Sequence, residues 1–131
     1  MTEREQIHAG WGELSPFAAI PAPTRSPDLE TEGPVRQLLM SGERDDGGWG
    51  FIGAFWLSID GRRGGFIVSP GALWHGSEMV RSYRGALARG WTEERIFSYW
   101  EGQAGTAGTY MIDPEAPPES LFQVARRVGA L

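Results

Sequence analysis

The chain contains no cysteine, no lysine and no asparagine among its 131 residues. Without cysteine it can form no disulfide bond, no thiolate zinc site and no cysteine nucleophile. All 12 basic residues are therefore arginine. The absence of thiols leaves the redox compartment of the protein undetermined.

Long apolar runs are missing as well. The first ten residues, MTEREQIHAG, are charged and have no apolar stretch of the length found in a signal peptide. No window of the sequence reaches the roughly 18 apolar residues that a membrane-spanning helix needs. We therefore expect a cytoplasmic protein that makes no membrane contact.

The charge balance has the wrong sign for a nucleic-acid partner. The chain has 17 acidic and 12 basic residues and a net charge of −5. A protein that neutralises many phosphates needs a dense basic stripe, and the sequence has none. Nucleic acid is therefore an unlikely partner on composition alone.

The residues that are present favour one globular domain preceded by an arm. The length suits a single domain, and 40% of the residues are hydrophobic, which is enough to form a core. Residues 1–33 show no helical or strand periodicity and contain four prolines. We therefore divide the chain into an extended proline-rich N-terminal arm, 1–33, and one α+β domain, 34–131. The arm carries several apolar residues, Trp11 among them, which favours packing on the domain or on a partner.

Four helical segments are expected after the arm. A short one begins at Pro34 and ends at Gly42, since proline suits the first turn and glycine the position just past the end. A second begins at the N-cap Ser77 and a third at the N-cap Thr92. The last opens near residues 117–119 and ends at Gly129.

The most distinct strand signal is a β-hairpin over residues 49–69. Large apolar residues occupy the odd positions Trp49, Phe51, Phe55, Leu57 and Ile59, while Ile52 and Trp56 interrupt the alternation. Turn residues fill 60–65, and a β-branched run then returns to Pro70. A further short strand is expected near 109–112. The predicted fold is α+β, a small antiparallel sheet (the hairpin and this strand) packed on one face by three to four helices.

No catalytic set is evident. If the protein is an enzyme, the best candidates are His75 and Glu78, three residues apart at a helix start, with Asp113 supplied from elsewhere. One histidine and one carboxylate do not make a metal site, and a capping or hydrogen-bonding role for His75 is the simpler interpretation. The pattern G-x-G-x-x-G at 48–53 precedes a strand rather than a helix, so it does not predict a dinucleotide site. We expect no metal and no cofactor.

The most unusual count is six tryptophans in a chain of this size. Tryptophan side chains at a surface often mark a protein interface or a ligand pocket. We expect Trp11, Trp49 and Trp91 to be accessible and to bind a partner or ligand, with Arg84 as an arginine for an anionic group. Trp56, Trp74 and Trp100 are expected to fill the core.

These observations favour a small acidic protein that binds a protein partner through exposed aromatic side chains, as an adaptor, inhibitor or immunity-type regulator does. A second copy of the chain, giving a homodimer, is one candidate partner. The alternative is a small enzyme or ligand-binding domain with an aromatic-lined pocket.

A helix-turn-helix regulator is the third and least favoured interpretation. Ala86, Gly90 and Ile96 have the spacing of that motif. However, Trp91 is bulky for its turn, and the glutamates of the second helix would repel a phosphate backbone.

Overall fold

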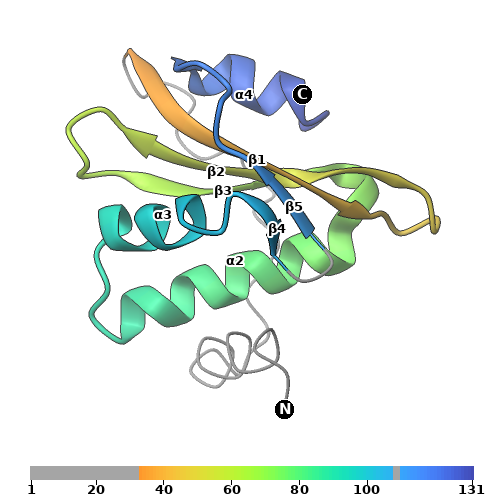
Figure 1. Cartoon of the computed structure of the whole chain (residues 1–131), viewed down its shortest axis with the longest axis horizontal. Helices are drawn as coiled ribbons and strands as arrows, with labels where there is room; N and C mark the ends of the chain where they lie inside the picture. Colours follow the sequence, from red (N-terminus) through yellow and green to blue (C-terminus); the bar gives the residue numbers. More distant parts are fainter. Residues whose placement is uncertain (1–32, 108–109) are drawn as a thin grey trace.

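The computed structural model describes residues 33–107 and 110–131. Residues 1–32 of the expected arm, with Trp11, lie outside this part of the chain. The described residues form an α+β domain, an antiparallel sheet with three helices packed against it (Figure 1). The predicted fold class is therefore confirmed.

The sheet has the strand order β3-β2-β1-β5-β4, and every pairing is antiparallel. A very short sixth strand, β6, pairs with the start of β1. The predicted hairpin over 49–69 is β2 and β3, and the strand expected near 109–112 is β5. The bounds of the strands are β1 Pro34–Glu43, β2 Trp49–Ser58, β3 Gly64–Val68, β4 Gly105–Ala107, β5 Tyr110–Asp113 and β6 Glu119–Ser120.

The helix predicted from Pro34 is wrong, because this segment is β1, the central strand of the sheet. Helices cover both faces of β1, so residues on both sides of the strand are buried and the alternation of polar and apolar residues is lost. Leu38 and Met40 face one core, while Val35 and Leu39 face the other. A short apolar run of this kind does not distinguish a helix from a buried strand.

The helices follow η1, a short 3-10 turn over Pro70–Ala72, and are α2 Leu73–Ala88, α3 Glu93–Glu101 and α4 Leu121–Arg127. The expected cap of α3 is confirmed, since the Thr92 side chain accepts a hydrogen bond from the Arg95 backbone N–H at 3.1 Å. The expected cap of α2 is wrong. This helix begins at Leu73, four residues before Ser77, and the carboxylate of Asp45 in the β1–β2 turn caps it.

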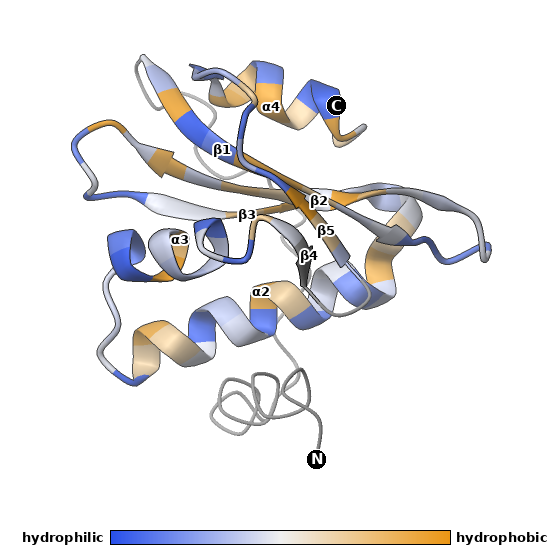
Figure 2. Ribbon diagram, viewed as in Figure 1, coloured by the Kyte–Doolittle hydropathy of each residue, from blue (hydrophilic) through white to orange (hydrophobic). Residues whose placement is uncertain are grey.

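The helices lie on both faces of the sheet, whereas we expected them on one face only (Figure 1). Helices α2 and α3 cover one face and enclose the larger core, in which Phe55 stacks on Trp100 with ring centroids 5.3 Å apart. Helix α4 covers part of the opposite face above a smaller core. Figure 2 shows apolar residues along the central strands, which lie between these layers.

A register shift between Met40 and Ser41 explains why Ile52 interrupts the alternation of β2. Ile52 is the extra residue of a β-bulge, so it turns into the larger core together with Phe55. Trp56 interrupts the alternation for another reason, because it faces the smaller core beneath α4.

Within the described ranges, no helix is both long enough and apolar enough to cross a membrane.

Candidate functional site

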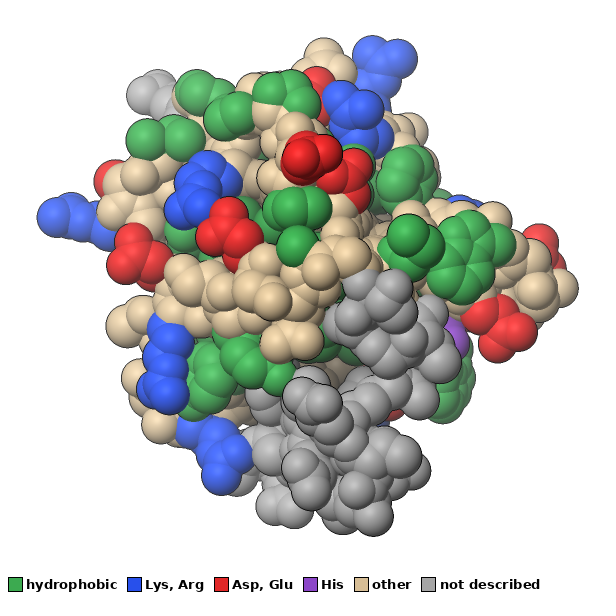
Figure 3. Space-filling model, in the orientation of Figure 1, with side chains coloured by type: hydrophobic (Ala, Val, Ile, Leu, Met, Phe, Trp, Pro, Cys, Tyr) green, Lys and Arg blue, Asp and Glu red, His purple; other side chains and the backbone are tan. Residues whose placement is uncertain are grey.

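One end of the molecule gathers large apolar side chains at the surface. We call it the hairpin end and define it by Trp49, Leu73, Trp74 and Met111, whose exposed fractions are 61%, 51%, 64% and 50%. Figure 3 shows hydrophobic side chains grouped over the β1–β2 hairpin, with acidic side chains beside them. Large apolar groups at this exposure are a common feature of interaction surfaces.

Trp49 and Met111 lie on the face of the sheet that α4 covers only in part. Side chains alternate along a strand, so Met111 points away from the larger core, into which Tyr110 and Ile112 project. Phe51, two residues after Trp49, packs at the margin of the smaller core. The apolar surface therefore begins where the cover provided by α4 ends.

Leu73 and Trp74 lie at the start of α2, on the other side of the hairpin. The Asp45 carboxylate accepts the Leu73 backbone N–H at 2.8 Å and the Trp74 backbone N–H at 3.2 Å. Its own backbone N–H donates to the Gly71 carbonyl at 2.9 Å. These bonds satisfy N–H groups that every helix start leaves unpaired, and they attach the β1–β2 turn to α2.

Arg44 reinforces this attachment. Its guanidinium donates to the Phe51 carbonyl at 3.2 Å and passes over Gly50 and Gly71. A Cβ at Gly71 would lie 1.6 Å from the Arg44 Nη2 atom, so only glycine leaves room for this path. Trp49 therefore follows a braced turn, and Trp74 lies at the start of a capped helix.

A surface hollow of about 510 Å³ adjoins Trp74. Leu73 and Trp74 supply its apolar wall, and the charged groups around it belong to Asp45, Glu78 and Arg81. The hollow could receive a side chain of a partner or a small ligand.

Of the candidate catalytic residues, His75 and Glu78 lie three residues apart on α2, whereas Asp113 lies on the other face of the sheet. His75 Nδ1 lies 2.8 Å from the Tyr110 hydroxyl, and the two rings meet edge to face at 5.4 Å. Asp113 lies on the face of β5 opposite Tyr110, and its carboxylate accepts the Glu115 backbone N–H. In the described ranges no three histidine or acidic side chains form a group that could hold a metal ion.

The remaining candidate residues lie away from the hairpin end. Trp91 is partly buried, under the Arg95 guanidinium at 4.0 Å and edge to face with Tyr99 at 5.9 Å. Arg84 is exposed on α2 and lines a separate cavity next to β3. Trp56 and Trp100 are buried as expected, whereas the expectation that Trp74 fills the core is wrong.

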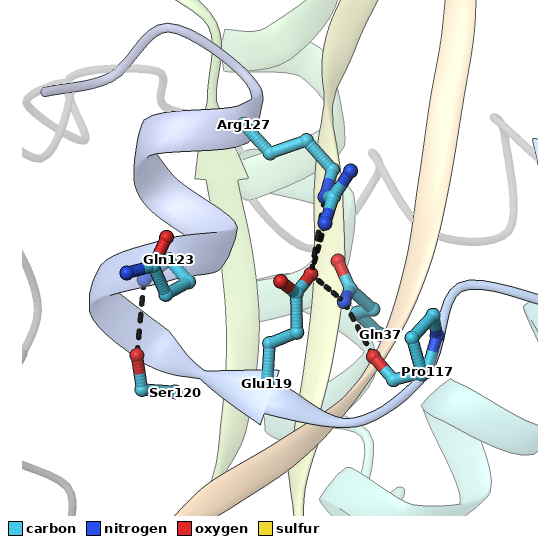
Figure 4. Close-up of polar contacts among 6 residues, drawn as sticks. All are labelled: Gln37, Pro117, Glu119, Ser120, Gln123 and Arg127. Carbon is cyan, nitrogen blue, oxygen red and sulfur yellow. Dashed lines mark hydrogen bonds and ion pairs between the residues drawn. The ribbon is translucent and has the colours of Figure 1, made fainter.

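A polar cluster at the other end of β1 has a structural explanation (Figure 4). The buried Gln37 amide donates to the Pro117 carbonyl and to the Glu119 carboxylate, both at 2.8 Å, and Arg127 pairs with the same carboxylate. The hydrogen bond from Gln37 and then that from Arg127 hold the pKa of Glu119 below its usual range. The cluster attaches the segment before α4 to the central strand.

Sequence reasoning found Trp49 but missed the group around α2. Trp74 was expected in the core with Trp56 and Trp100, and no local sequence pattern singled out Leu73. The sequence does contain one signal for this group of residues, namely the acidic residues Glu43, Asp45 and Asp46 shortly before Trp49. That Asp45 caps a helix 28 residues further along the chain could not be seen locally.

Comparison of the chain with models of known families, with curated proteins and with solved structures finds no match.

Proposed function

We propose that this protein works by binding a partner protein through the hairpin end, in the manner of a small adaptor, inhibitor or immunity-type regulator. The observation that carries the proposal is the exposure of Trp49 and Trp74, 61% and 64%, on either side of one braced turn. Tryptophan supplies more binding energy per residue than most side chains, and a pre-ordered surface loses little entropy on binding.

The charges around the hairpin end suggest the character of the partner. Two acidic residues, Glu43 and Asp46, shortly precede Trp49 in the sequence. The hollow beside Trp74 is lined by Glu78 and by one cationic side chain, Arg81. An apolar surface bordered by basic side chains would complement this arrangement.

The proposal is tested by site-specific photo-crosslinking in the cells that make the protein. A photoreactive phenylalanine derivative replaces Trp74 in one variant and Phe122 in the control, because Phe122 is a 46% exposed aromatic on α4, away from the hairpin end. We expect one protein to crosslink from position 74 and not from position 122.

Affinity measurements with that purified partner complete the test. Trp49→Ala and Trp74→Ala should each weaken the complex by about tenfold or more, as loss of a central tryptophan commonly does, while Phe122→Ala leaves it unchanged. Unaltered affinity in both tryptophan variants, or crosslinking that does not depend on position, would contradict the proposal.

A second candidate function is the binding of a small charged ligand in the hollow beside Trp74. Its support is the volume of about 510 Å³ and the presence of Glu78 and Arg81 of opposite charge in its lining. A ligand that binds only the folded state raises the melting temperature, so a thermal-shift screen of metabolites tests this function. Arg81→Ala should abolish any shift that arises in the hollow.

A further inference from the structure

Strand β3 forms an open edge of the sheet. Ser58 N–H donates to the Arg63 carbonyl at 2.8 Å, and Ser69 N–H donates to the Ile52 carbonyl at 2.9 Å, so positions 63 and 69 face β2. Because hydrogen-bonding direction alternates along an antiparallel strand, the backbone groups of Gly64, Phe66 and Val68 face away from β2. In the described part of the chain β3 pairs with β2 alone.

This edge lacks the features that usually protect one. Soluble proteins place charged residues, prolines or bulges on exposed edge strands to prevent unwanted pairing. Strand β3 has the sequence GGFIV and contains none of these. Its two glycines, Gly64 and Gly65, are partly buried and carry no side chain that could block pairing along the edge.

A cavity of about 220 Å³ lies at the same edge. Residues 64–66 of β3, Trp56 of β2 and Val80, Arg84 and Leu87 of α2 line it. The cavity therefore lies beside the first residues of β3, next to α2.

Helix α2 supplies the wall of a groove along this edge. Val80, Arg84 and Leu87 follow one another at intervals of four and three residues, so they form one stripe along the helix beside the cavity. Its apolar members are the buried Val80 and the partly buried Leu87. The one charged group in the stripe is Arg84, which is exposed and faces the cavity.

We infer that the groove between β3 and α2 binds an extended segment of a partner protein that adds to the sheet as a further strand and places a carboxylate on Arg84. The N–H and C=O groups of Gly64, Phe66 and Val68 that face away from β2 supply the backbone hydrogen bonds. An apolar side chain of the segment fills the cavity, and the positive charge of Arg84 favours an aspartate or glutamate next to it. This surface is separate from the hairpin end and does not depend on it.

The test uses the full chain and a displayed library of random eight-residue peptides. We expect enriched peptides to alternate apolar residues and to carry one acidic residue at a fixed position. Binding of a synthetic copy is then measured by fluorescence polarisation against pairs of variants.

Val68→Pro removes an outward N–H without touching the pairing with β2, and Val68→Ala, which keeps that N–H, is its matched control. The proline variant should weaken peptide binding by about tenfold, because it loses one hydrogen bond to the added strand and distorts the edge next to it. The alanine variant keeps this hydrogen bond and should weaken binding much less. Arg84→Glu should weaken binding of the acidic peptide by a similar factor and should select basic peptides from the library instead. The affinity of Arg84→Gln for the acidic peptide should lie between those of the wild type and Arg84→Glu. Thermal melting confirms that each variant is folded.

Failure to enrich any peptide, or equal weakening by Val68→Ala and Val68→Pro, would overturn the inference. A dimer of the protein that Val68→Pro dissociates would assign the edge to a second copy of the chain. Displacement of the selected peptide by a synthetic peptide of residues 1–32 would assign it to the N-terminal segment of the chain itself. Either result would show that the groove holds a part of this protein and not a segment of a partner protein.

Discussion

The two faces of the sheet are covered to different extents. Helices α2 and α3, of 16 and 9 residues, enclose one face, while the 7-residue α4 encloses part of the other. The first face buries a continuous cluster of aromatic side chains, and the second leaves Trp49 and Met111 outside its cover. Because α4 is short, it covers the smaller core and leaves an exposed apolar surface next to that core.

The larger core should therefore dominate the stability of the fold. Phe55 is fully buried, with ring centroids 4.7 Å from Phe66 and 5.3 Å from Trp100. Phe55→Ala should lower the free energy of unfolding by about 3–5 kcal/mol, because it removes a large side chain and leaves a cavity. Urea denaturation measures this loss.

Leu121→Ala on the opposite face provides the comparison. Leu121 is also fully buried, but it belongs to the smaller core. We expect its loss to lower the free energy of unfolding by about 2–3 kcal/mol, near the lower end for a buried leucine. A larger loss at Leu121 than at Phe55 would show that the α4 face carries the fold.

The next effect concerns the attachment of α4. Gln37→Ala removes two hydrogen bonds and leaves the Glu119 carboxylate with Arg127 alone, so the free energy of unfolding should fall by about 1–3 kcal/mol. The variant should also exchange the amide protons of α4 faster, while those of α2 are less affected. Hydrogen exchange measures this difference between the two faces.

The pH dependence of the same variant sharpens the comparison. The folded-state pKa of Glu119 lies below its ordinary value of 4.5, so its contribution to stability is present above that value and is lost as the pH falls through the folded-state pKa. The stability difference between the wild type and Gln37→Ala should therefore narrow on acidification. A difference that stays constant down to acid-induced unfolding would mean that the charge of Glu119 is not involved.

A smaller effect is expected at the cap of α2. Asp45→Ala removes the acceptor of the Leu73 and Trp74 N–H groups and should lower the free energy of unfolding by about 1 kcal/mol. Asp45→Asn is the matched control, because an asparagine side chain also caps helices well. Asparagine keeps one acceptor oxygen where the aspartate uses both, so Asp45→Asn should lose less stability than Asp45→Ala. Equal losses would show that a single acceptor does not cap this helix.

The smallest effect on stability is expected at the hairpin end itself. Trp49→Ala should change the free energy of unfolding by no more than about 0.5 kcal/mol, as is usual for an exposed side chain. Thermal or urea unfolding checks this value. A large loss would show that Trp49 supports the fold, and its exposure would then no longer favour a role in binding.

Several elements could be predicted because signals within a few residues specify them. The Thr92 cap, the turn residues between β2 and β3 and the six tryptophans act over a few residues, so the α3 start, the hairpin and the aromatic surplus could be predicted. The count of tryptophans could not say which of them are buried, because burial depends on what lies opposite each one.

The remaining features depend on contacts between segments that are distant in the sequence. The segment after Pro34 became the central strand because α2 and α3 cover one of its faces and α4 the other, which removes the periodicity that marks a strand. The start of α2 is capped by Asp45, 28 residues earlier in the sequence, and Trp74 is exposed at this start. Contacts between residues that are distant in the sequence thus determine where the exposed surface lies, and local sequence patterns do not predict such contacts.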